Sequence, residues 1–309
     1  MIRLGLCCKF QEAPIKFRTT TAAAIRRLSW SDGRKKLANL CEANATALME
    51  ALEFCAASQI GCFRVNSQIL PLKTHPEVGY SLQDLPDGQR IVDAFQACGR
   101  FRKKAGLRIT FHPDQFVVLN SPREDVVRQS LEEIEYQAEV AGWIGADMVN
   151  VHAGGGYGDK QAALETLSAN IYKLSRHARK VLTLENDDRS YTPADLLPFC
   201  GEHNIPFVYD VHHHRCTPDG MSVEEATRQA MATWNREPLF HLSSPLEGWK
   251  GPKPQRHHDY IDAADFPACW LGLDVTVEVE AKAKELAVKR LAKLLGGKSV
   301  SLSLRRDRR

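Results

Sequence analysis

Short apolar runs rich in β-branched and aromatic residues recur along the chain, separated by longer segments of mixed polarity. Most of these runs are continuous rather than alternating, as expected for parallel strands that are buried on both faces. The pattern predicts eight strands, at Ile2–Leu6, Gly61–Val65, Leu107–Phe111, Met148–His152, Val181–Leu184, Phe207–Tyr209, Leu239–Leu242 and Val275–Val279.

Helical patterns fill the intervals between the strands. Apolar residues recur at helical spacing over 37–55, and Ser121–Pro122 places an N-cap residue before a proline, which predicts a helix from there to about Gly142. Thr192–Pro193 repeats this device before a helix over 194–200.

Eight βα units in about 290 residues match the count and size of a single (β/α)8 TIM barrel. A doubly wound open sheet is the alternative, but it usually has fewer strands and one binding crevice. No linker rich in Pro, Gly or Ser divides the chain. We therefore expect one α/β domain over residues 1–296, followed by a basic, flexible tail over 297–309.

From the third predicted strand to the eighth, each run ends in or beside a side chain that can bind a metal. In a parallel barrel these positions share the C-terminal rim, where ligands bind. Imidazoles and carboxylates without thiolates suit Zn²⁺ or Mn²⁺, and clustered divalent ions commonly hydrolyse phosphodiesters. The expected ligands are His112, His152, Glu185, Asp210, His213, His241 and Glu280.

Local sequence distinguishes some of these ligands from their neighbours. Glu185 follows a buried apolar run, where an unpaired carboxylate is costly, and a position bridging two metals would compensate its charge. A D-x-x-H spacing from Asp210 selects His213 among three consecutive histidines. Alternation places Glu278 and Glu280 on one face of the last strand, and we prefer Glu280 because it lies nearer the strand end.

Two features favour a nucleic-acid partner. Gln115 and Phe116 follow His112 on a rim loop, where an amide and an aromatic ring can enter a duplex beside a displaced base. Basic residues that can meet phosphates lie at Arg26–Arg27, Arg34–Lys36, Arg100–Lys104 and Arg123. Each feature also has a structural reading, as a solvated helix face or as core packing.

Composition says more about the compartment in which the protein works than about its activity. The formal net charge of +3 permits an anionic partner without demanding one. Nine cysteines, an odd number without a CxxC pair, indicate free thiols in a reducing compartment. No apolar run approaches the length of a membrane span, and the apolar start of the chain is too short for a signal sequence. We expect a soluble, cytoplasmic monomer without a membrane partner.

The chain resembles the UV damage endonuclease family up to about Leu295. The motifs that carry the resemblance are IRLGLCCKF, KFRT, FRVNSQILP, HPDQFVVLNS, VNVHAGGGYGDK, LTLENDDRSYTP, DVHHH, HLSS and EVEAKAKE. The resemblance implies a TIM barrel related to endonuclease IV, acting on double-stranded DNA. It implies incision immediately 5′ to cyclobutane pyrimidine dimers and 6-4 photoproducts by a metal-activated hydroxide. Mn²⁺ is the metal it implies, with Zn²⁺ or Mg²⁺ as alternatives.

The resemblance also implies how two or three ions are held. Glu185, as a bridge, and His241 are the implied catalytic residues. His75 in KTHPE matches a family histidine near the site, and His257 is preferred over His258 in the third set. The implied sets are Glu185, Asp210, His241 and Glu280 for one ion, His112, His152 and Glu185 for a second, and His213 and His257 for a third.

Contacts to the DNA lesion are implied for Gln115, Phe116, Asn66, Lys9 and Phe10. Two departures affect them. Phe116 stands where some relatives have tyrosine, and the first loop lacks the tyrosine and asparagine that other members carry.

Two other functions are compatible with the rim ligands. An endonuclease IV-like enzyme would cut at abasic sites instead. A metal-dependent sugar isomerase would also place His, Glu and Asp on a TIM-barrel rim, but it needs a lysine near the sugar and has little use for Gln115 and Phe116.

Overall fold

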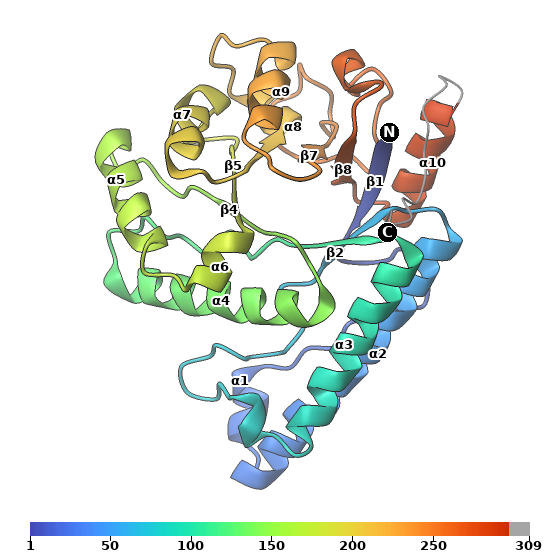
Figure 1. Ribbon diagram of the computed structural model, residues 1–309, viewed down its shortest axis with the longest axis vertical. Coiled ribbons are helices and arrows are strands. Elements are labelled where there is room, and N and C mark those ends of the chain that lie inside the picture. The colour runs from blue at the N-terminus through green and yellow to red at the C-terminus, as the bar shows by residue number, and fades with distance from the viewer. Residues whose placement is uncertain (297–309) are drawn as a thin grey trace.

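The computed structural model describes residues 1–296 and confirms the predicted barrel. Eight parallel strands are hydrogen-bonded in chain order, and pairing of the first with the last closes the sheet (Figure 1). The strands are β1 (Ile2–Cys7), β2 (Cys62–Val65), β3 (Arg108–Phe111), β4 (Val149–His152), β5 (Leu182–Glu185), β6 (Phe207–Asp210), β7 (Leu239–Leu242) and β8 (Val275–Val279). The predicted tail over 297–309 lies outside the described residues.

An outer layer of helices surrounds the barrel. Helix α2 has 28 residues against four in β2, and it forms with α3 a long pair that reaches away from the barrel (Figure 1). The helices are α1 (Ala22–Arg26), α2 (Trp30–Ala57), α3 (Gly88–Ala105), α4 (Glu124–Ile144), α5 (Lys160–Ile171), α6 (Arg176–Val181), α7 (Pro193–His203), α8 (Val211–Cys216), α9 (Val223–Ala232) and α10 (Glu285–Gly296), with 3-10 turns η1 (Leu82–Asp84) and η2 (Ala268–Trp270).

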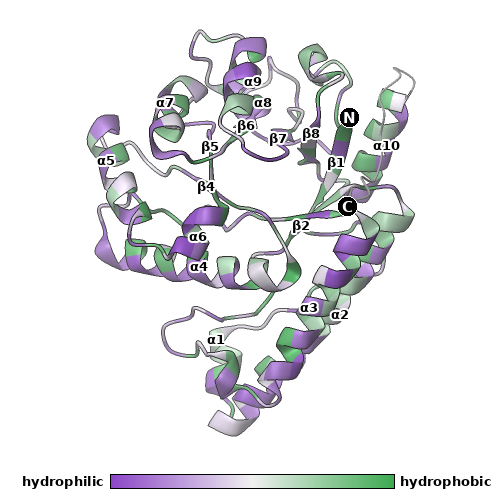
Figure 2. Ribbon diagram, in the orientation of Figure 1, coloured by the Kyte–Doolittle hydropathy of each residue, from purple (hydrophilic) through white to green (hydrophobic). Residues whose placement is uncertain are grey.

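Apolar side chains from strands and helices form one large core. Every residue of β2, β3 and β8 is buried, and the outer helices carry both hydrophobic and hydrophilic residues (Figure 2). In α3, Ile91, Phe95 and Cys98 recur at helical spacing and are buried. This one-sided periodicity drives each helix onto the sheet, because only its apolar stripe gains from burial.

The two Ser/Thr-Pro pairs behave differently. Thr192 caps α7 as predicted, with Pro193 in the first turn and Asp195 completing a capping box. Helix α4 instead begins at Glu124, so the predicted start at Ser121 is wrong. The Ser121 hydroxyl accepts a hydrogen bond from the Arg123 amide at 3.2 Å and forms a local turn before the helix.

Strand register brings the expected rim residues together. His152 lies beside Glu185 in the β4–β5 pair, and Asp210 lies beside His241 in the β6–β7 pair. His241 in turn lies beside Glu278 in the β7–β8 pair. Val181, predicted as the first residue of β5, ends α6 instead, and Glu185 is the last residue of β5.

Two observations bear on the setting of the protein. All nine cysteines are free. Within residues 1–296, each helix is too short or too polar to cross a bilayer.

Candidate metal centre

Glu185 is the centre of a polar cluster at the C-terminal rim. Its carboxylate is buried and bonded on several sides. His112 Nε2 lies 2.9 Å from Glu185 Oε2, and His241 Nδ1 lies 2.9 Å from Oε1. The Asn150 amide donates to Oε2 at 2.5 Å. Side chains from β4, from β7 and from the residue directly after β3 therefore meet at one carboxylate of β5.

The cluster contains three overlapping groups of possible metal ligands, and within each group the donor atoms lie within 4.8 Å of one another. Glu185 belongs to two groups, as expected for a bridging carboxylate, and Asp210 also belongs to two. The groups are His112, His152 and Glu185; Glu185, Asp210 and His213; and Asp210, His241 and Glu280.

Unpaired polar atoms show that the cluster fits cations. His152 Nδ1 and Asp210 Oδ2 are buried without a hydrogen-bond partner among the described residues. Such atoms are costly unless a ligand pairs with them. Because the donors are imidazole nitrogens and carboxylate oxygens, the missing partner that fits them is a divalent metal ion.

The electrostatics of the cluster follow from burial opposed by nearby charge. Burial acts to raise the pKa of Glu185, but His241, His152 and His112 hold it well below its ordinary value. Burial acts to lower the pKa of His213, yet Asp210 and Glu185 raise it to about 9. For His152 burial dominates and lowers the pKa, so its ring stays neutral and available as a ligand.

Hydrogen bonds around the candidate ligands fix their orientation. The side-chain amide of Asn186 donates to the backbone carbonyl oxygen of Asp210 at 2.9 Å. The backbone amide of Asp210 donates to Asn186 Oδ1 at 3.0 Å. His213 Nδ1 lies 3.0 Å from the Asn186 carbonyl oxygen. His112 Nδ1 similarly lies 3.0 Å from the Pro113 carbonyl oxygen. Partners of this kind hold imidazole rings in a fixed direction toward a metal.

Two buried residues beside the cluster were not predicted from the sequence to be site residues. Arg64 of β2 donates to Glu280 Oε1 at 2.6 Å and to Glu278 Oε2 at 2.5 Å. Glu278, which sequence reasoning passed over for Glu280, also accepts from the Thr110 hydroxyl at 2.5 Å. The available signal was a charged residue inside an apolar strand, in FRV for Arg64 and in VEV for Glu278.

The loop after β7 carries His257 to the edge of the cluster. His257 Nδ1 lies 3.8 Å from Glu280 Oε2, and an antiparallel bridge between His257 and Pro245 holds the loop. The neighbouring His258 has its Nδ1 occupied, since it accepts the Tyr260 amide at 2.9 Å. His257 is thus better placed than His258 to join the cluster, and its role as a ligand stays a prediction.

Other predicted residues lie apart from the three groups. His75 Nδ1 accepts the Glu77 amide at 3.1 Å, within its own loop. Phe10 packs its ring against Phe54 and Phe63, with centroids 5.2 and 5.8 Å away. Lys9 is exposed beside it. Metal binding by His75 and lesion contacts by Lys9 and Phe10 stay predictions.

The rim loop after β3 presents the residues expected to meet DNA. Phe116 is 76% exposed, which excludes the core-packing reading for its ring. Gln115 is also exposed, and Asn66 lies half-buried at the end of β2. Their contacts with DNA stay predictions.

The glycines after His152 serve the fold first. A Cβ on Gly154 would lie 2.0 Å from Asn120 Oδ1, and the residue has φ of +91°. The Gly155 carbonyl oxygen accepts from the Asn120 amide at 2.8 Å. These glycines thus allow close packing of the β4 loop.

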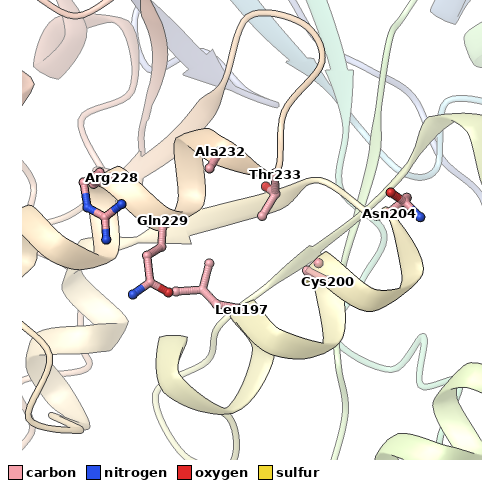
Figure 3. Close-up of a pocket in the computed structure, with 8 residues that line it drawn as sticks. Leu197, Cys200, Asn204, Arg228, Gln229, Ala232 and Thr233 are labelled. Carbon is pink, nitrogen blue, oxygen red and sulfur yellow. The ribbon is translucent and has the colours of Figure 1, made fainter.

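A depression of about 310 Å³ lies on the outer helical layer between α7 and α9 (Figure 3). Its described lining contains neither a carboxylate nor an imidazole, and its residues are Leu197, Cys200, Gly201, Asn204, Arg228, Gln229, Ala232 and Thr233. The chemistry of the barrel therefore belongs to the rim cluster and not to this depression.

Comparison with known proteins agrees with the cluster. A UV DNA damage endonuclease of Bacillus cereus strain G9842 is 32% identical over 287 residues, covering 89% of this chain and 87% of that protein. The crystal structure of SacUVDE superimposes with a TM-score of 0.85 at 26% identity, covering 97% of this chain and all of that one. Endonuclease IV of Thermus thermophilus, at 15% identity and a TM-score of 0.56, covers 96% of this chain and 98% of its own, and shows the shared fold alone.

The model of the family described as UV-endonuclease UvdE matches residues 2–302, which include every ligand of the three groups. A closed parallel barrel, a buried Glu185-centred cluster on its rim and this match over nearly the full chain agree with one another, and the chain belongs to the UV-endonuclease UvdE family.

Proposed function

We propose that this protein is a repair endonuclease that nicks double-stranded DNA immediately 5′ to UV photoproducts, with a cluster of divalent metals at the barrel rim. The observation that carries the proposal is the Glu185-centred cluster of imidazole and carboxylate donors, two of whose buried atoms have no hydrogen-bond partner among the described residues, in a chain that belongs to a UV-endonuclease family.

The rim residues divide into ion-binding and orienting groups. Glu185 belongs to the group with His112 and to the group with His213. Asp210 belongs to the group with His213 and to the group with Glu280. When bound, divalent ions at such a site supply Lewis acidity and charge neutralisation for phosphodiester hydrolysis. The protein contributes a rigid frame, because the other candidate ligands stand at strand ends, His213 stands on α8 directly after β6, and neighbouring groups hold the rings.

We further propose that the cluster holds two or three ions and that Mn²⁺ is the working metal. Nitrogen and oxygen donors suit this ion, although Zn²⁺ and Mg²⁺ compete for similar sites. The nine free thiols support a reducing compartment, and we propose a cytoplasmic monomer.

Lesion recognition is assigned to the loop after β3. Gln115 and Phe116 are exposed on the side of the barrel that bears the cluster, three and four residues after His112. A photodimer already weakens base stacking, so displacing it from the duplex costs less than displacing sound bases. An amide and an aromatic ring that enter the duplex would stabilise the displaced state.

Incision of a defined duplex tests the proposal. A DNA duplex with one cyclobutane dimer and one labelled end is incubated with the protein and Mn²⁺, and product length locates the cut. We expect one nick at the phosphodiester 5′ to the dimer and none in an undamaged duplex. Cutting of an abasic duplex in preference to the dimer would favour an endonuclease IV-like activity, and turnover of free ketoses without incision would favour an isomerase.

A further inference from the structure

Arg64 and Glu278 form a buried layer directly beneath the metal-binding groups. Neither belongs to those groups, and both are almost inaccessible, with side chains 8% and 1% exposed. The Arg64 guanidinium donates to Glu278 Oε2 and to Glu280 Oε1, and its Nη2 lies 2.7 Å from His241 Nε2. This layer therefore supports two candidate ligands at once.

The ring of His241 presents its two nitrogens to different surroundings. Nδ1 faces the cluster, 2.9 Å from Glu185 Oε1 and 3.6 Å from Glu280 Oε1. Nε2 faces the supporting layer, 3.2 Å from Glu278 Oε2. A neutral ring that binds a cation through Nδ1 must carry its proton on Nε2, and that proton needs an acceptor.

Arg64 is unable to accept this proton, because a guanidinium only donates hydrogen bonds. In the described part of the chain, the acceptor in range of His241 Nε2 is the Glu278 carboxylate. The 2.7 Å approach of Arg64 Nη2 to the same nitrogen suits a ring whose proton is on Nδ1. Binding a cation through Nδ1 therefore requires His241 to exchange Arg64 for Glu278.

We propose, on the basis of the proposed function, that Glu278 is a positioning residue that accepts the Nε2 proton of His241 when Nδ1 binds the metal and thereby keeps the ring in its metal-binding form. Thr110 and Arg64 anchor the Glu278 carboxylate from other sides, so its position is fixed before the metal arrives. Its burial at 1% exposure keeps it from touching DNA.

The barrel offers a matched control at its opposite end. Glu237 accepts from an arginine, Arg3, at 2.9 Å and from a threonine, Thr276, at 2.6 Å, as Glu278 does from Arg64 and Thr110. These hydrogen bonds to Glu237 come without a histidine. Glu237→Gln therefore removes a partly buried, arginine-bound charge without touching the metal-binding groups.

The test measures Mn²⁺ affinity by titration calorimetry in the full chain. Glu278→Gln is expected to weaken binding by about ten- to a hundredfold, the usual effect of losing a partner behind a metal ligand, while Glu237→Gln binds as wild type does. The double variant Arg64→Met/Glu278→Met removes both buried charges. If Glu278 merely neutralised Arg64, this double variant would regain wild-type affinity, whereas a positioning role predicts that it stays weaker than Arg64→Met alone, which keeps Glu278 and measures the separate loss of the Arg64 contact to Glu280.

A spectroscopic reading identifies the proton itself. In protein with ¹⁵N-labelled histidine and loaded with Zn²⁺, the wild type is expected to show a protected proton on Nε2 of His241, assigned by its loss in His241→Asn. The double variant is expected to lack that signal. Wild-type affinity in Glu278→Gln, or restored affinity in the double variant, overturns the inference. Because binding is measured without DNA, failure to cut UV-damaged DNA would reject the proposed function and leave this test intact.

Discussion

The two ends of the barrel treat buried charge in opposite ways. At the N-terminal end, Arg3 donates to Glu237 at 2.9 Å and to the Gly106 carbonyl oxygen at 2.6 Å. Arg108 donates to Asp147 at 3.1 Å and to the Thr276 hydroxyl at 3.0 Å. Arg3 and Arg108 thus each have a carboxylate, and most of their other donors meet carbonyl or hydroxyl oxygens, while a third arginine, Arg236, lies 3.8 Å from the same Asp147 that Arg108 binds.

At the C-terminal rim the charges do not balance. Arg64 stands among four buried or nearly buried carboxylates, which are Glu185, Asp210, Glu278 and Glu280. Histidines supply part of the missing positive charge, since the pKa of His213 is raised to about 9, but two buried atoms of the ligand groups have no partner within residues 1–296. A protein bears such a deficit of positive charge when a ligand compensates it. The comparison teaches that charge balance separates a structural polar layer from a metal-binding one, although both are buried in the same barrel.

The largest expected effect is at the centre of the rim. Glu185→Gln removes the charge shared by two ligand groups, so we expect incision of a dimer-containing duplex to be abolished. Metal affinity should fall by more than about a hundredfold, since losing even an indirect partner costs ten- to a hundredfold. Incision assays and metal analysis of the purified variant check both. Wild-type rates of incision with unchanged metal content would show that Glu185 is not a metal ligand.

Removing the metal should affect the rim and leave the N-terminal end unchanged. Chelation is expected to abolish incision, and Mn²⁺ to restore it. At a metal concentration a hundred times Kd, binding adds about 2.7 kcal/mol to the free energy of unfolding, which chelation removes. Calorimetric unfolding with and without chelator measures this loss. Full activity in protein shown to be free of metal would exclude metal catalysis.

The rim loop should affect binding more than chemistry. Phe116→Ala is expected to weaken binding to dimer-containing DNA by roughly ten- to a hundredfold, because base–aromatic stacking contributes about 1–3 kcal/mol. Gln115→Ala should reduce discrimination against intact DNA, and the double variant should lose more than either change alone. Metal content should stay unchanged. Binding is compared at one fixed salt concentration, because phosphate contacts dominate non-specific affinity.

Tyr172 is a matched control for the loop. It is 63% exposed, like Phe116, but it caps α5 at the end remote from the β4 rim. Tyr172→Ala should bind damaged DNA as wild type does. If the Gln115/Phe116 double variant also binds and cuts like wild type, recognition lies elsewhere, with the first loop around Lys9 and Phe10 next to be tested.

The smallest expected effect on activity comes from the N-terminal end. Arg3→Met leaves Glu237 without its arginine, and we expect the free energy of unfolding to fall by about 2–3 kcal/mol, below the 3–5 kcal/mol of a fully buried pair because Glu237 is 20% exposed. Incision per folded molecule should not change. Urea unfolding and kcat of the folded variant are the measurements. A large loss of kcat at undiminished stability would erase the distinction between the two ends.

Local sequence was sufficient to predict where a helix begins when the contacts that start the helix are local. Thr192 and Pro193 start α7 as predicted, because capping depends on residues within one turn. Ser121 and Pro122 carried the same pattern, yet α4 starts three residues after Ser121. There the serine hydroxyl forms a turn with the Arg123 amide, a choice that the short pattern leaves open.

The sequence by itself determined the barrel and the kind of chemistry on its rim. Eight apolar runs separated by helical segments allow few other folds, and strand-end His, Asp and Glu residues of a parallel barrel must gather at one edge. What the periodicity left open is the depth of each residue below that edge. Glu278 and Glu280 share a face, but only the register of β8 against β7 places Glu278 behind His241 and Glu280 among the ligands.

Tertiary structure also decided which charges are compensated. Arg64, Thr110 and Glu278 come from three strands, and no spacing in the chain predicts that their side chains meet. The unpaired atoms of His152 and Asp210 are likewise visible only once all neighbours are in place. Residue type and strand position are properties of the sequence, whereas the balance of buried charge arises from contacts between residues far apart along it.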